Sequence, residues 1–312
     1  MQDHSKKIKY GAMMLASFIL LLAGVFFIPF IGLLLMVFLP LPIILYRLRE
    51  DRKTTYYVVL IAGVLSLLLG GPILLLFALV FGIIAFLIAE FLLLGKSKLY
   101  IFMATGLVMI FVGIVTYLIL ALFFDINIID SLMAVLKESE NQFKASLNEF
   151  GALPEGYENV VAEAFMLYRS SIPAVFILSV YAFAFIMVIP NFMVLRRLGH
   201  EVPKFPPFYQ LKLPVITIFI YGLLIILPFV MNMTTDSSTY LLYINGTIIL
   251  RVLLLLQGLS LVHYFMFRMK LPRIVTVLSI ILALLFNPIT ILLGILDIGV
   301  NIRAWIRKDN SK

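Results

Sequence analysis

The sequence predicts an all-α membrane protein, a polytopic helical bundle of about eight transmembrane helices with a C-terminal kinked or re-entrant helical hairpin. The mean hydropathy is +1.13, 63% of the residues are hydrophobic and only 13% are charged. A soluble domain carries about a quarter charged residues. Apolar runs recur from Gly11 to Ile302 without the alternation that a transmembrane β-barrel requires.

Eight apolar runs, separated by polar or Gly/Pro-containing turns, define the expected spans. Lys6, Lys7 and Lys9 precede the first run as in a signal peptide, but no small-residue cleavage site follows, so the first span is expected to be uncleaved. The expected spans are Gly11–Phe27, Ile31–Tyr46, Thr54–Leu69, Ile73–Leu94, Leu99–Phe124, Ile172–Leu195, Leu211–Met231 and Tyr240–Phe267. Pro173 falls in the first turn of the sixth, where proline is tolerated.

A last apolar region, Ile274–Ile302, is cut by Asn287-Pro288. Each of its two pieces is short of the about 20 residues that a crossing needs, so we expect a hairpin folded at this dipeptide. The alternative is one long kinked helix that ends outside, which would place Arg303 on the wrong side.

The distribution of charge predicts the orientation. The N-terminus, the loops and the C-terminal tail on one side hold 20 of the 24 Lys and Arg residues, whereas residues 125–170 carry eight acids against Lys137, Lys144 and Arg169. The positive-inside rule therefore places both termini in the cytoplasm. The chain, 1–312, is expected to form a single integral membrane domain.

Residues 125–170 are expected to be an extracytoplasmic acidic segment of amphipathic helices. Helical spacing runs from Ile129 to Phe150 with Gly151 as its stop, and a second short apolar face covers 160–168. The segment is either a structured connecting loop or a lid.

Arg251 lies near the middle of the 28-residue run Tyr240–Phe267. A guanidinium near the bilayer centre is costly, so we expect it to face protein, water or a counter-charge. Asp297 is the expected partner if the hairpin packs on this span, either as a structural clamp or as part of a ligand site. The polar residues predicted for this site are Arg251, Asn245, Thr247, Gln257 and Asp297, although the three uncharged ones have hydrogen bonds between helices as an alternative role.

Two further ionisable residues lie in apolar spans. Glu90 is close to the expected cytoplasmic face and is predicted to reach the interface or to pair with Lys96 or Lys98. His263 is four residues from the inner end of its span, where an interfacial or hydrogen-bonded histidine is expected.

Broken helices are the second indication of a site. Exposed backbone at membrane depth is tolerated only beside protein or a water-filled cavity, so interrupted spans indicate binding sites, with a plain kink as the alternative. Ala12 and Ala16 form a small-xxx-small pair suited to close helix docking, either within the molecule or with a partner. The interruptions involve Pro40, Pro42, Gly70, Gly71, Asn287 and Pro288.

Catalysis is not predicted. The sequence has no HExxH, GxSxG or P-loop motif, no cysteine and three isolated histidines, so no cofactor or metal is expected. The net charge of +8 is explained by topology, so nucleic acid is not an expected partner.

The run Gly32–Tyr46 with Leu39-Pro40-Leu41-Pro42, the cluster Arg47–Lys53 and Gly70-Gly71-Pro72 together resemble the YybS family of multi-spanning bacterial membrane proteins. This resemblance implies the plasma membrane but no established activity. More remotely, the first five spans resemble the S components of energy-coupling-factor vitamin transporters, in which an AxxxA pattern docks the coupling subunit. Ala12 and Ala16 match that pattern, whereas those components have six helices.

Two functions follow as hypotheses. The first is a substrate-binding or transport-associated membrane component, with a small ligand at Arg251, Asn245, Thr247 and the broken ends near Pro40, Pro42 and Gly70-Gly71, and with an energising subunit as partner. The second is a non-transporting scaffold or assembly protein in which Arg251 is an internal clamp.

Overall fold

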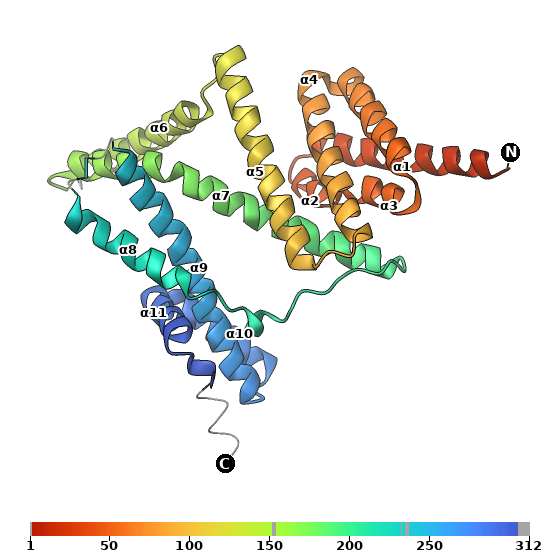
Figure 1. Cartoon of the computed structure of the whole chain (residues 1–312). Coiled ribbons are helices and arrows are strands. Elements are labelled where there is room, and N and C mark those ends of the chain that lie inside the picture. Colours follow the sequence, from red (N-terminus) through yellow and green to blue (C-terminus); the bar gives the residue numbers. More distant parts are fainter. Residues whose placement is uncertain (1, 152–153, 232, 235–236, 305–312) are drawn as a thin grey trace. The chain divides into compact units, whose positions relative to one another are not determined.

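The computed structural model describes residues 2–151, 154–231, 233–234 and 237–304, with side chains from residue 6 onward. All secondary structure in these ranges is helical. The chain divides into two compact units (Figure 1): unit 1 is Met1–Ile126 with Ser179–Phe205, and unit 2 is Asn127–Leu178 with Pro206–Lys312. Whether they make up the single membrane domain expected from the sequence stays a prediction.

Unit 1 contains the N-terminal helices and the end of α7. Its helices begin where side chains accept hydrogen bonds from free backbone N–H groups: Asp51 caps α4 and Ser97 caps α5. The elements are α1 (Gln2–Phe27), α2 (Ile31–Phe38), α3 (Leu41–Arg49), α4 (Arg52–Leu93), α5 (Lys98–Phe123) and the second half of α7 (Tyr157–Arg197).

The 42-residue helix α4 is a hairpin, as the sequence predicted for Gly70-Gly71-Pro72. Gly71 has φ +71°, a conformation that glycine adopts without strain, and the two arms fold back on each other there (Figure 1). The ring centroids of Tyr56 and Phe86, one on each arm, are 4.6 Å apart.

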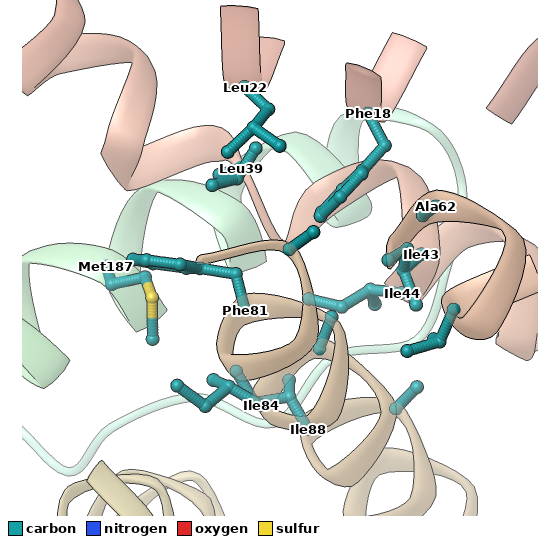
Figure 2. Packing of buried hydrophobic residues seen from close by; sticks show 14 of the residues in the cluster. Phe18, Leu22, Leu39, Ile43, Ile44, Ala62, Phe81, Ile84, Ile88 and Met187 are labelled. Atoms are coloured by element: carbon teal, nitrogen blue, oxygen red, sulfur yellow. The ribbon is translucent and has the colours of Figure 1, made fainter. Parts of the chain in front are cut away.

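The hydrophobic core of unit 1 lies between α1, the α2–α3 pair, both arms of α4 and α7. Figure 2 shows its buried side chains converging from these helices. Lipid tails are as apolar as these side chains, so close packing between the helices, rather than removal from water, holds this core together. The labelled members are Phe18, Leu22, Leu39, Ile43, Ile44, Ala62, Phe81, Ile84, Ile88 and Met187.

Unit 2 is organised around α9, which packs on α8, α10, α11 and η1. Its buried apolar cluster consists of Leu254, Ile291 and Ile298. The elements are α6 (Ile128–Glu149), the first half of α7, η1 (Phe208–Gln210), α8 (Ile216–Val230), α9 (Ser238–Arg268), α10 (Arg273–Leu285) and α11 (Asn287–Gly299).

The predicted break at Asn287-Pro288 is confirmed: α10 and α11 meet there at a bend of 104°. Six helices in the described part of the chain are long and apolar enough to cross a membrane, or up to seven if this bent pair is one span. The predicted number of eight is therefore not confirmed, and whether the pair crosses or re-enters stays a prediction.

The segment after α6 differs from the prediction. Gly151, at φ +62°, follows the end of α6 as expected. The second amphipathic stretch is not a separate short helix, however, because it continues through Pro173 into the next span as one helix of 41 residues, α7. Pro173, which has no backbone N–H to donate, thus lies within a helix rather than in its first turn.

Candidate functional site

Asn245 supports α7 at this proline. Its side-chain Oδ1 accepts a hydrogen bond from the N–H of Ala174 at 2.8 Å, and its Nδ2 donates to the carbonyl of Ser170 at 2.8 Å. These two groups are the partners of one rung of the α-helical ladder. The amide of α9 therefore inserts into the backbone of α7, beside Pro173, and stabilises a disturbed turn.

Asp297 and Gln257, both predicted site residues, are in contact. Asp297 lies on α11 with none of its surface exposed, and its Oδ2 accepts from Nε2 of Gln257 at 2.5 Å and from Nε of Arg303 at 2.9 Å. Its ion-pair partner is thus Arg303. The pairing with Arg251 that the sequence suggested is not present. The bend before α11 lets this helix cross α9 so that its far end reaches residues 257–264.

The same cluster fastens the linker before α8 to α9. Arg303 donates to the carbonyl of Tyr209 at 2.7 Å, Ser260 donates to the carbonyl of Phe208 at 2.8 Å, and the N–H of Leu213 donates to Oε1 of Gln257 at 2.9 Å. Nη2 of Arg303 also donates to Ser260 at 3.1 Å. Oδ1 of Asp297 is buried without a partner among the described residues. The hydrogen bonds of the other groups hold the linker, α9 and α11 together, which is a structural role.

Two glycines allow α9 and α11 to cross at backbone distance. A side chain at Gly258 would collide with the carbonyl oxygen of Thr290, and one at Gly294 with the carbonyl oxygen of Leu254. Small residues permit such close approach between membrane helices. The crossing brings Asp297 within hydrogen-bonding distance of Gln257.

Arg251 is in a different situation. It is exposed and forms no ion pair or hydrogen bond with any residue that the structure describes. One turn before it, Thr247 has a buried hydroxyl for which the described residues offer no partner. Both lie well inside the 31-residue helix α9. Arg251 is therefore an open polar position in unit 2, and the hydroxyl of Thr247 beside it is buried.

Glu90 in unit 1 is fully paired, although not with Lys96 or Lys98 as expected. Its two carboxylate oxygens accept from Nε of Arg47 at 2.5 Å and from Nε of Arg52 at 2.9 Å. The hairpin in α4 returns the chain to the α3–α4 junction, which lies far away in sequence. Glu90 is therefore a structural clamp.

The predicted break at Pro40 and Pro42 is also present, since α2 ends at Phe38 and α3 begins at Leu41. The last carbonyls of a helix lack intrahelical donors. Asn191 of α7 supplies one, because its Nδ2 donates to the carbonyl of Val37 at 2.7 Å. This break is thus covered by protein.

Ala12 and Ala16 are exposed and line an apolar groove of about 420 Å³ together with Leu65. Within unit 1 the pair is open rather than packed. The ring of His263 is tilted against Phe208 and edge-to-face with Tyr209, with ring centroids 6.0 and 5.6 Å away. Its Nδ1 is buried without a hydrogen-bond partner among the described residues.

Arg303, Ser260 and Asn191 were not predicted as functional or structural polar residues. Arg303 follows the last apolar run, where a cation is expected from topology alone, and Ser260 is isolated in an apolar helix. An intramembrane asparagine was the one available signal for Asn191.

A family model described as "Predicted membrane protein (DUF2232)" matches residues 15–298. The chain belongs to this family of predicted membrane proteins. It is 24% identical over 303 residues to the uncharacterized protein YybS of Bacillus subtilis (strain 168), across 95% of this chain and 97% of that protein. No solved structure matches.

Membership of the DUF2232 family agrees with the resemblance to YybS and with an integral membrane protein of the cell membrane. The matched range includes Arg251, Asn245, Gln257 and Asp297, while Ala12 and Arg303 lie outside it. The resemblance to S components and the cytoplasmic position of the termini stay predictions.

Proposed function

We propose that this protein is a substrate-binding, transport-associated membrane component in which Arg251 holds an anionic group from outside unit 2. The proposal rests on two properties of Arg251, its position near the middle of α9 and its exposed, unpartnered side chain. Arg251 lies 13 residues from the start of α9 and is exposed without a partner in the described part of the chain. An arginine at mid-membrane costs at least about 2.5–3.5 kcal/mol, so a compensating anion is required.

The alternative role of Arg251 as an internal clamp required an ion pair with Asp297, but Asp297 is paired with Arg303 instead. The hydroxyl of Thr247, one turn away from Arg251, is buried, so the exposed guanidinium of Arg251 is the donor that meets a carboxylate or phosphate from outside. Asn245 and Gln257 are held by α7 and by the linker, and they form the rigid surroundings of the site rather than its ligands.

Movement of a substrate would need an energising subunit, since the sequence has no P-loop. The open pair Ala12 and Ala16 on α1 is the proposed docking position for that subunit. Small residues there let a partner helix approach closely.

The test is affinity purification from native membranes, followed by mass spectrometry of proteins and small molecules. Wild type is expected to retrieve an anionic small molecule and an ATPase-containing complex. Arg251→Leu should lose the small molecule, while Arg273→Leu, a matched exposed arginine at the start of α10, should retain it. Identical small-molecule content in all three preparations would refute the proposal.

The second candidate is a scaffold or assembly protein. It is favoured by the openness of the Ala12–Ala16 groove together with the ion pair between Asp297 and Arg303, which holds Asp297 within unit 2. It predicts that assembly factors co-purify, that Ala12→Leu with Ala16→Leu releases them, and that Arg251→Leu does not.

A further inference from the structure

A second groove lies on unit 1, on another face of α1. It is lined by apolar side chains of α1, α2 and α3 and has a volume of about 530 Å³. Among its lining residues are Met14, Ser17 and Leu21 on one wall and Leu35, Pro42 and Leu45 on the other. Lipid tails are as apolar as leucine, so such a groove accepts an acyl chain but does not select one.

One end of the groove carries charge. Lys7 is seven residues before Met14 and fourteen before Leu21, so the three share one helix face. On the other wall, Arg49 lies one turn beyond Leu45. Both cationic side chains are exposed, by 59% and 57%, so their remaining N–H donors are accessible.

These two cations are held at the groove end by neighbours. The guanidinium of Arg49 lies 4.3 Å from the ring centroid of Tyr10, whose hydroxyl donates to the carbonyl of Leu45 at 3.4 Å. The buried carboxylate of Glu50 is 3.4 Å from Lys7 Nζ and 4.0 Å from Arg49 Nε.

These contacts leave part of the positive charge of Lys7 and Arg49 uncompensated. The carboxylate of Glu50 is shared by two cations. Asp51, which accepts from the N–H groups of Lys53 and Thr54, is balanced in charge by Lys6 and Lys9, which flank Lys7 in the sequence. The end of the groove therefore has an excess positive charge beside an apolar channel. An anionic amphiphile matches this arrangement, with a phosphate at the cations and a chain in the groove.

We propose that this groove binds an anionic phospholipid of the surrounding bilayer, with its phosphate between Lys7 and Arg49 and one acyl chain along α1 and α3. The position is independent of Arg251, which lies in unit 2. Each cation is expected to contribute about fivefold to the preference for an anionic over a neutral lipid.

The experiment is native mass spectrometry of the full chain released from nanodiscs that contain equal amounts of phosphatidylglycerol and phosphatidylcholine. Wild type should carry a retained phosphatidylglycerol. Lys7→Gln with Arg49→Gln should lower this preference about 25-fold, whereas Lys53→Gln with Arg197→Gln removes the same charge from unit 1 elsewhere and should leave it unchanged.

A groove-filling variant, Ser17→Phe with Leu21→Phe, keeps both cations and should also lose the retained lipid. Unfolding temperatures in phosphatidylcholine nanodiscs check that each variant is folded. Several outcomes would overturn the proposal: retention of the preference in the charge variant or in the folded groove-filled variant, displacement of the lipid by millimolar inorganic phosphate alone, or a co-purified protein in place of the lipid.

Discussion

Asp297 and Arg251 are two charged residues in the apolar helices of unit 2, and their surroundings are opposite. Asp297 is fully buried and accepts hydrogen bonds from Arg303 and Gln257. Arg251, on the helix against which Asp297 packs, has no such partner in the described ranges. The sequence predicted that these two residues would pair with each other.

The difference separates a residue held by structural contacts from one for which we propose a binding role. A buried carboxylate that is paired with an arginine holds helices together, and removal of one partner leaves an unpaired charge behind. An unpaired charge at mid-membrane lowers stability and persists where it serves binding. Substitutions at the two positions should therefore change stability in opposite directions.

The largest expected effect is that of Asp297→Asn. Loss of the carboxylate leaves Arg303 buried without its counter-charge, which should lower the free energy of unfolding by about 3–5 kcal/mol. Denaturant unfolding in detergent measures it. The control is Asp130→Asn, which breaks an exposed pair with Arg169 and should cost at most about 1 kcal/mol. Equal losses would contradict a structural role for Asp297.

Arg251→Leu should act in the other direction. Replacement of an unpartnered guanidinium by an apolar side chain is expected to raise the free energy of unfolding by about 1–3 kcal/mol in lipid nanodiscs. The measurement is thermal unfolding of the protein stripped of co-purified small molecules. A loss of stability as large as that of Asp297→Asn would mean that Arg251 is held within the molecule.

Asn245→Leu should have a smaller effect. The variant loses the side-chain bridge to α7, but Ala174 N–H and Ser170 C=O can then bond each other, so the net cost is about 1 kcal/mol. Thr247→Val on the same helix is the control, because its buried hydroxyl has no partner among the described residues and its removal should not lower stability. A double-mutant cycle with Pro173→Ala tests whether the bridge compensates for the proline.

The fold was predictable where the cause is local. Apolar runs gave the helices, and Pro40, Gly71 and Pro288 gave the three breaks, since each changes backbone conformation at its own position. The continuity of α7 through Pro173 was missed because its compensation comes from Asn245, 72 residues later in the sequence.

The partners of charged residues were not predictable for the same reason. Glu90 was assigned to lysines a few residues away, but the hairpin brings it to Arg47 and Arg52. Asp297 was assigned to Arg251, but its ion-pair partner, Arg303, lies only six residues later, and only the hydrogen bond with Gln257 depends on how α11 crosses α9. Sequence shows which charges need partners, whereas the crossing of helices decides which partners they find.

The smallest expected effect concerns an exposed ion pair outside the membrane spans. It extends the comparison to a charged pair that is surrounded by water. Lys144 on α6 bonds Glu158 at 2.5 Å, and this hydrogen bond raises the pKa of Lys144. A raised folded-state pKa means that the stabilisation is complete below the unfolded value and is lost as pH rises through the folded one. The α6–α7 contact should therefore loosen only in strongly alkaline solution, with spin labels at 147 and 160 moving apart above about pH 10.5. Lys144→Gln should remove this pH dependence, and its persistence would show that other groups hold α6 against α7.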